Sequence, residues 1–139
     1  MSAPLEGLRV IELAHVMAGP ICGLFLADLG ADVVKVERLP DGDTTRYFSP
    51  PEIKGESAAF MMLNRGKRGV ALDLRTEEGQ AVVRQMVSSA DVVIENFRVG
   101  TMERMGLGYE DLAALNKRLI YCQITGFGRN GPLSTQGGL

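Results

Sequence analysis

The chain has 139 residues, a formal net charge of −2 and 45% hydrophobic residues, which suits one ordinary globular domain, residues 1–139. The slightly acidic balance argues against nucleic acid as a partner, because no face can be strongly basic overall. No apolar run approaches the roughly 18 residues of a membrane span, and the N-terminus lacks a signal-peptide pattern, so we predict a cytoplasmic protein without a membrane partner.

The first part of the chain has the pattern of a β-α-β unit. Residues 8–14 are a run of branched apolar side chains, as in a buried strand, and residues 32–37 form a second such run. Between them, residues 21–29 have apolar side chains at helical spacing, with Pro20 suited to the first turn and Gly30 to the C-terminal cap. This order indicates a parallel sheet with a right-handed crossover.

The alternation continues along the chain. Residues 39–55 are rich in Pro, Gly, Asp and Thr, which predicts an exposed loop. Further strands are expected at residues 69–74, 91–97 and 119–125. Helices are expected at residues 57–64, 76–88, 101–106 and 109–116. The whole pattern predicts an α/β fold with a Rossmann-like, doubly wound, mainly parallel sheet.

The last segment, residues 126–139, is a glycine-rich loop without a closing helix. A native domain seldom ends in a long loop that follows a buried strand. We therefore expect a truncation, so that residues 1–139 are the N-terminal part of a domain and no second domain is present.

Ligands of open α/β sheets bind at the carboxyl ends of the strands. The loop after the first strand contains Gly19 and Gly23 but lacks the G-x-G-x-x-G fingerprint, so an anion-binding helix start and a plain turn are equally consistent with it. Arg38 follows the second strand, where it would neutralise the 2′-phosphate of NADP or the 3′-phosphate of CoA, or else be a solvated charge. For His15 a structural role is favoured over acid–base work, because no partner carboxylate can be identified.

Other charged and aromatic residues leave similar alternatives. The basic pairs Lys67–Arg68 and Arg98 with Arg104 suit a pyrophosphate or a carboxylate, but such charges are more often solvated. Asn96 and Phe97 combine an amide with a ring, as adenine or pantetheine would require, and Phe97 is equally suited to the core. Four acidic residues lie in predicted helices, ion pairs or strand ends, and none has the pattern of a nucleophile: Asp28, Glu37, Asp73 and Glu95.

Metal binding is not predicted. Cys22 and Cys122 lie far apart in apolar stretches and form no C-x-x-C pair, so we expect buried free thiols. His15 is the single histidine, which excludes a histidine-rich metal site.

Short motifs follow one another in a definite order along the chain. They occupy residues 4–13, 15–20, 29–38, 42–46, 64–74, 91–97, 105–108, 116–121 and 125–128. Each is weak alone, but their order and spacing are specific. Together they resemble the family III CoA-transferases, which include formyl-CoA transferase, carnitine CoA-transferase and α-methylacyl-CoA racemase.

The resemblance implies the N-terminal portion of a CoA-binding, Rossmann-like domain from an interlocked homodimer. It implies an acyl-CoA:carboxylate CoA-transferase, with an acyl-CoA and a carboxylic acid as small-molecule substrates. The implied CoA contacts are Met17, Ala18, Arg38, Leu72, Asp73, Leu74, Arg75, Asn96, Phe97, Arg98 and Arg104.

The same resemblance implies covalent catalysis by an aspartate, which takes the acyl group as a mixed anhydride and then carries CoA as a thioester. That aspartate lies downstream of the motif at residues 125–128. We therefore expect no catalytic residue in this chain, with His15 at most an accessory, and no turnover by the chain alone.

Two departures from the family pattern bear on the reaction. Met17 replaces the glutamine of formyl-CoA transferase, which disfavours a formyl or oxalyl substrate. Leu139 stands where racemase-type members carry a catalytic histidine, which places an acyl-CoA racemase second. A non-catalytic CoA-binding fragment is a third hypothesis, and an NADP-dependent dehydrogenase is disfavoured by the missing glycine fingerprint.

Overall fold

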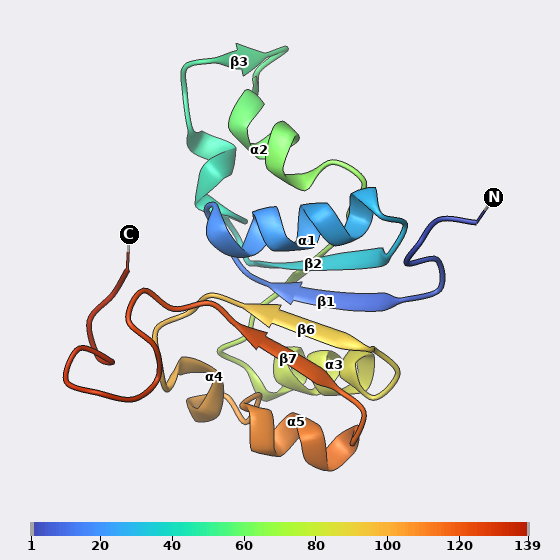
Figure 1. Ribbon diagram of the computed structural model, residues 1–139. Coiled ribbons are helices and arrows are strands. Elements are labelled where there is room, and N and C mark those ends of the chain that lie inside the picture. Colours follow the sequence, from blue (N-terminus) through green and yellow to red (C-terminus); the bar gives the residue numbers. More distant parts are fainter. Residues whose placement is uncertain (1, 139) are drawn as a thin grey trace.

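A central parallel sheet organises the molecule (Figure 1), and the computed structural model describes residues 2–138. The five strands have the order β5-β2-β1-β6-β7, and all neighbours are parallel. They are β1 (Arg9–Leu13), β2 (Asp32–Arg38), β5 (Arg68–Leu72), β6 (Val92–Glu95) and β7 (Ile120–Gln123). The chain order reverses between β1 and β6, as in doubly wound α/β folds. The predicted fold class is confirmed.

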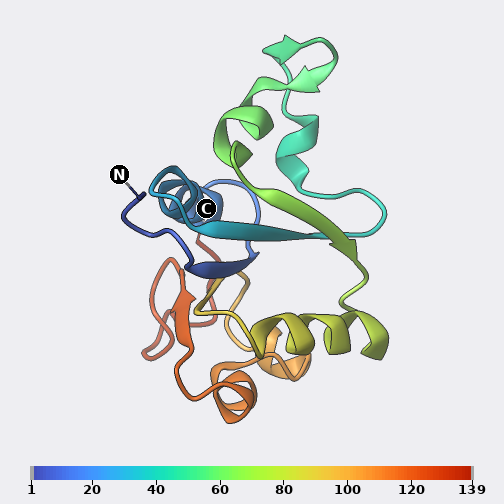
Figure 2. The ribbon, with the colours of Figure 1, turned by 90° about the vertical axis from the view of Figure 1, so that its right-hand side faces the viewer.

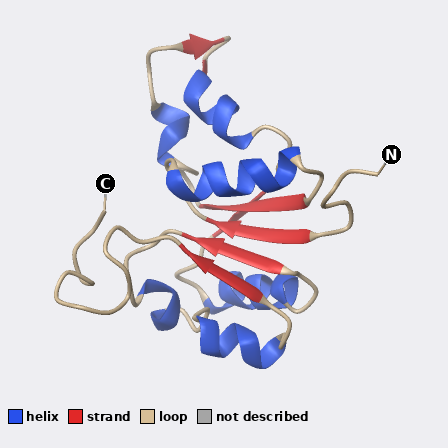
Figure 3. Cartoon of the chain, in the orientation of Figure 1, coloured by secondary structure: helices blue, strands red, loops and turns tan. Residues whose placement is uncertain are grey.

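Helices cover both faces of this sheet (Figure 2, Figure 3). On one face, α1 (Ala18–Asp28) packs on β1, β2 and β6, and α2 (Ala58–Asn64) packs beside α1. The other face carries α3 (Glu77–Val87), α4 (Thr101–Arg104) and α5 (Tyr109–Leu115). Every predicted helix is present, although α1 begins earlier than expected. Within residues 2–138, no helix is long and apolar enough to span a membrane.

Local sequence signals explain where α1 begins and ends and where α3 begins. Gly30 follows the last turn of α1 with φ +100°, a left-handed conformation that a side chain would strain. At the other end, a Cβ on Gly19 would come within 2.1 Å of the Ala14 Cβ, so only glycine lets α1 start this close to β1. Thr76 caps α3, because its side chain accepts a hydrogen bond from the Gly79 amide.

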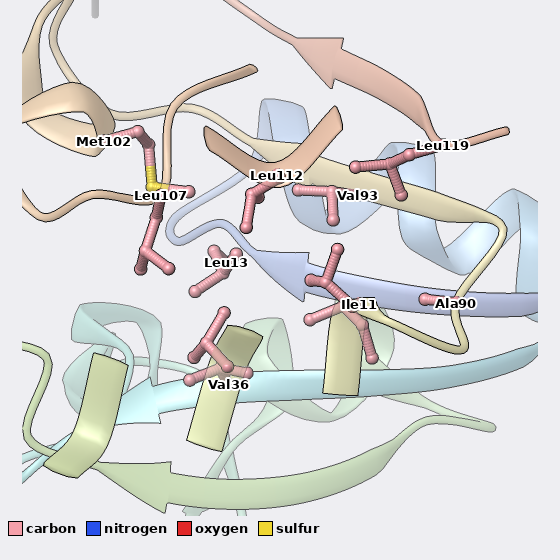
Figure 4. Close-up of a cluster of buried hydrophobic side chains, with 11 residues drawn as sticks. Ile11, Leu13, Val36, Ala90, Val93, Met102, Leu107, Leu112 and Leu119 are labelled. Carbon is pink, nitrogen blue, oxygen red and sulfur yellow. The ribbon is translucent and has the colours of Figure 1, made fainter. Parts of the chain in front are cut away.

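The two faces of the sheet have separate apolar clusters. The larger one lies between the sheet and α3 to α5, where Ile11, Leu13 and Val93 meet Leu107 and Leu112 (Figure 4). The smaller one lies on the α1 side and includes Val10, Val33 and Ile94. Alternate residues of each strand contribute to opposite clusters, as the period of a strand requires.

The segment between β2 and α2 differs from the prediction of an exposed loop. It contains a 3-10 helix, η1 (Thr44–Tyr47), and a two-stranded antiparallel pair, β3 (Glu52–Ile53) with β4 (Glu56–Ser57). Asp43 and Thr45 within it are buried. The expectation of exposure was wrong for these two residues, because their polar groups find partners inside the fold.

The two cysteines, Cys22 on α1 and Cys122 on β7, pack against the same apolar cluster. The expectation of free thiols is confirmed, but neither residue is fully buried. Burial and the neighbouring Cys122 thiol raise the pKa of Cys22, so its protonated thiol is favoured and its nucleophilicity is low.

Candidate functional site

The candidate site lies at the carboxyl edge of the sheet. There the loop after β1 lies next to the ends of β2 and β6, which are the two strands that flank β1. Two adjoining cavities open at this edge, of about 150 Å³ and about 460 Å³. Both are lined by His15 and Phe97, whose rings lie 5.2 Å apart between centroids. The site therefore has two compartments that share one ring pair.

The loop after β1 is held by side chains from elsewhere in the sequence. The His15 amide donates to Asn96 Oδ1 at 3.0 Å, and Asn96 Nδ2 donates to the His15 carbonyl at 2.8 Å. The Val16 amide donates to Asp43 Oδ1 at 3.2 Å, although Val16 has a left-handed φ of 66°. A branched residue in this conformation is strained, and such strain persists only where the surroundings enforce it.

A buried network of charges lies beneath this loop, on the α1 side of the sheet. Lys35 Nζ lies 3.0 Å from Glu12 Oε1 and 2.9 Å from Asp43 Oδ2, and it donates to the Ala14 carbonyl at 2.7 Å. Lys67 Nζ lies 2.8 Å from Glu12 Oε2 and donates to the Pro20 carbonyl. The side chains of Lys35 and Lys67 are 2% exposed and that of Glu12 is fully buried. Two cations and two anions thus neutralise one another away from water.

The position of α1 depends on one small residue over this network. A Cβ on Gly23 would lie 1.9 Å from Glu12 Oε2, so any larger residue would displace the carboxylate or the helix. Neither Glu12 nor Lys35 is among the residues that we predict for the site. The signal that reveals them is a charged residue at an inward position of an otherwise apolar strand.

A further buried anion supports the same segment. Glu37 accepts hydrogen bonds from the Asp43 amide at 2.8 Å and from the Arg46 guanidinium at 2.7 Å through each of its oxygens. Burial opposes ionisation of Glu37, but Arg46 and the Asp43 amide outweigh it and hold the pKa of Glu37 below its ordinary value. Asp43 is likewise ionised: burial opposes its charge, and the Thr45 amide and Lys35 lower its pKa.

Some of the predicted contact residues line the two cavities, and the others do not. Arg38 and Leu74 line the smaller one, whereas Ala18, Asn96 and Arg98 line the larger one. The remaining predicted residues line neither of these two cavities: Met17, Leu72, Asp73, Arg75 and Arg104. Met17 is nonetheless half exposed beside the edge.

The arginines at this edge differ in their partners. Arg38 donates from Nε to the Gly42 carbonyl at 3.2 Å, and no carboxylate within residues 2–138 forms an ion pair with it or with Arg98. Arg75 is instead paired with Asp73 on the surface at 2.8 Å. Arg104 is exposed and donates to the Thr101 hydroxyl at 3.0 Å.

The structure corrects the prediction for Lys67, which precedes β5. The sequence predicts a solvated or phosphate-binding side chain, but Lys67 lies in the buried network, where burial lowers its pKa. Arg68 forms a surface ion pair with Asp32 at 2.6 Å. Neither lines the two cavities at the carboxyl edge.

His15 is half-buried between the cavities. Burial lowers its pKa, and Lys35 and Arg38 act in the same direction, whereas Asp43 opposes them. The neutral imidazole is therefore favoured near neutral pH. Its backbone groups are bonded to Asn96, and Asp43 is a charged neighbour that the sequence did not reveal. A structural role for the imidazole stays a prediction. The leucine assigned to the racemase histidine position, Leu139, lies outside the described residues.

Comparisons with known proteins place this architecture in a family. Residues 5–139 match the model of CoA-transferase family III. The chain is 54% identical over 135 residues to a succinate–glutarate CoA-transferase of Agrobacterium fabrum, with 93% of this chain and 34% of the relative covered. A human succinyl-CoA:glutarate CoA-transferase is 41% identical, with 97% of this chain and 31% of the relative covered.

A solved structure agrees with these relatives. A crystal structure of a CaiB/BaiF family protein from Brucella suis superposes with a TM-score of 0.93 at 52% identity, covering 99% of this chain and 37% of that one. The chain thus spans about a third of the length of the relatives that it matches. The chain belongs to CoA-transferase family III.

Proposed function

We propose that residues 1–139 form the CoA-binding part of an acyl-CoA:carboxylate CoA-transferase. The observation that carries this proposal is the pair of arginines, Arg38 and Arg98, which line adjoining cavities without a carboxylate partner among the described residues. CoA carries a 3′-phosphate and a pyrophosphate, and guanidinium groups bind phosphate oxygens through paired hydrogen bonds. Two separated anionic groups on one ligand match two separated cations.

Other features of the edge support the same ligand. The first turn of α1 contains no acidic residue and has no side-chain cap, so its amides and helix dipole favour an anion. Phe97 offers an apolar surface between the two compartments. We assign Arg38 to the 3′-phosphate and Arg98 to the pyrophosphate, with the other predicted contacts around them.

The names of the relatives support a short dicarboxylic acid as the acyl partner. They include succinate–glutarate, succinyl-CoA–D-citramalate, succinyl-CoA–L-malate and succinyl-CoA:mesaconate CoA-transferases. We infer that the longer protein exchanges CoA between such acids through an aspartate beyond residue 139. The chain alone should then bind CoA without transferring it. A homodimer and a cytoplasmic location remain predictions.

The 3′-phosphate assignment is tested with CoA and dephospho-CoA. Wild-type protein should bind CoA about tenfold more tightly, as expected for a charge-assisted pair, and Arg38→Ala should remove that preference. Isothermal titration calorimetry gives both constants. Arg118→Ala is the matched control, because Arg118 is exposed and precedes β7 at the opposite edge of the sheet. Equal affinity of the wild type for the two ligands would refute the phosphate role of Arg38.

A further inference from the structure

Hydrogen bonds connect the strained loop after β1 to the buried charges beneath it. Val16 has a φ of 66°, a left-handed conformation that is strained for a branched residue. The loop that contains Val16 contributes to both cavities and leads directly into α1. A contact with another part of the fold must therefore offset this strain. The position of the loop in turn decides the shape of the ligand site.

Asp43 is placed to offset the strain at Val16. Its Oδ1 atom accepts hydrogen bonds from the amides of Val16 and Thr45 at 3.2 and 2.9 Å and from the Thr45 hydroxyl at 2.8 Å. Its Oδ2 atom is fixed by Lys35 at 2.9 Å. The residue is 3% exposed, so it has little freedom to turn away.

Lys35 links the same carboxylate to the other end of the loop. The ammonium group contacts Asp43 Oδ2 and Glu12 Oε1, and it donates to the carbonyl of Ala14, two residues before Val16. Asn96 holds His15 between them through both of its backbone groups. Three consecutive residues of the loop, Ala14 to Val16, are thus each bonded to a polar side chain of another element.

We propose that Asp43, supported by Lys35, is a positioning residue of the ligand site, which fixes the His15–Met17 loop in its left-handed conformation at Val16. This inference rests on the proposed CoA site. The carboxylate does not itself bind CoA in this account, because an anion beside a phosphate would repel it. It holds the loop from which the Met17 and Ala18 contacts are presented.

Asp43→Ala removes the acceptor of the Val16 amide and tests the proposal in two ways. CoA affinity should fall about tenfold, the range expected for loss of a hydrogen bond to a charged group. Hydrogen exchange of the Val16 amide should become much faster in the absence of any ligand. The exchange measurement tests the loop even if the wild type fails to bind CoA, an outcome that would count against the proposed function alone.

Leu112→Ala is the control for a general loss of stability. Leu112 is fully buried on the opposite face of the sheet and lines neither cavity of the site. This variant should lower the unfolding temperature and leave CoA affinity and Val16 exchange unchanged. If Leu112→Ala and Asp43→Ala changed both quantities equally, Asp43 would have a general structural role and the proposal would be overturned.

A rescue variant distinguishes the effect of backbone strain at Val16 from a general loss of fold stability. Glycine adopts positive φ without a steric penalty, so Val16→Gly in the Asp43→Ala background should recover part of the lost affinity. Destabilisation by an unbalanced buried charge would not be relieved by that change.

If Asp43→Ala does not fold, Thr45→Val retains every charge and removes one donor to Asp43 Oδ1. It should weaken CoA binding about threefold, and unchanged binding and exchange would refute the role of Asp43.

Discussion

The two faces of the sheet are built on different principles. On the α1 face, the strands β1 and β2 bury Glu12 and Lys35 as part of a network of four charges. On the opposite face, the same strands bury Ile11, Leu13 and Val36 against α3 to α5. The charged face bonds directly to the loop of the candidate site, whereas the apolar face contributes Leu13 and Val36 to the wall of its smaller cavity.

This difference indicates that one face mainly stabilises the fold and the other mainly positions the loop. Apolar burial is non-directional and supplies most of the stability of a fold. Ion pairs that are fully desolvated contribute little net stability, but they require one geometry and are costly to disrupt. A network that bonds directly to the loop at Ala14 and Val16 therefore defines the position of that loop better than an apolar contact would.

The largest effect is expected from breaking the charged face. Glu12→Gln keeps the shape of the side chain but leaves Lys35 and Lys67 without their shared counter-ion. It should lower the free energy of unfolding by about 3–5 kcal/mol, as for other buried charges that lose a partner. Urea denaturation at neutral pH measures the loss.

The control for Glu12→Gln is a carboxylate-to-amide change in a surface pair. Asp32→Asn removes the partner of Arg68 on the neighbouring strand, where both side chains are largely exposed. Its cost should stay below about 1 kcal/mol. Similar losses for Glu12→Gln and Asp32→Asn would contradict the view that the network depends on burial.

A smaller effect of a different kind is expected from the apolar face. Leu112 is fully buried, and Leu112→Ala should cost about 3 kcal/mol through lost transfer energy and the cavity left behind. Since no charge is involved, the loss should be the same at pH 5 and pH 8. Leu115→Ala, at an exposed position of the same helix, should change stability by less than about 0.5 kcal/mol. If the loss of unfolding free energy in Leu112→Ala depended strongly on pH, the proposed difference between the two faces would be contradicted.

The smallest effect concerns Glu95, whose place in β6 puts its side chain on the apolar face. It is fully buried, and its Oε2 accepts a hydrogen bond from the Phe97 amide, while its Oε1 and Gln123 Oε1 have no hydrogen-bond partner within residues 2–138. Burial raises the pKa of Glu95, so its protonated form is more favourable in the folded state than in the unfolded chain. Glu95→Gln supplies an amide donor for Gln123 and should stabilise the fold by about 1 kcal/mol at pH 7.

The pH dependence of this gain has a definite sign. Because the pKa of Glu95 is raised above its ordinary value of 4.5, its favourable contribution is complete below that value and is lost as the pH rises through the folded pKa. The advantage of Glu95→Gln should therefore grow from near zero at pH 4 to its full size at higher pH. Thermal unfolding at several pH values follows it, and a constant or shrinking advantage would show that Glu95 is well accommodated as an anion.

Much of the fold could be predicted from the order of residues. The apolar runs of β1, β2 and β6, with Pro20 in the first turn of α1 and Gly30 after its end, indicate a parallel sheet from the sequence alone. Such signals are local, since side chains a few residues apart report the period of the element that contains them. The ordered motifs likewise indicated the family, which the comparison over residues 5–139 confirms.

The order of residues therefore indicates the main strands and helices, the parallel sheet and the family, but not η1, β3 or β4. Which charges are buried and what they hold depends on the tertiary structure, because Glu12, Lys35, Asp43 and Lys67 come from four separate segments. It moved Lys67 from a solvated charge into the network and Asp43 from an exposed loop to the support of Val16. Burial and ion pairing depend on contacts between distant parts of the chain, and local spacing carries no record of them.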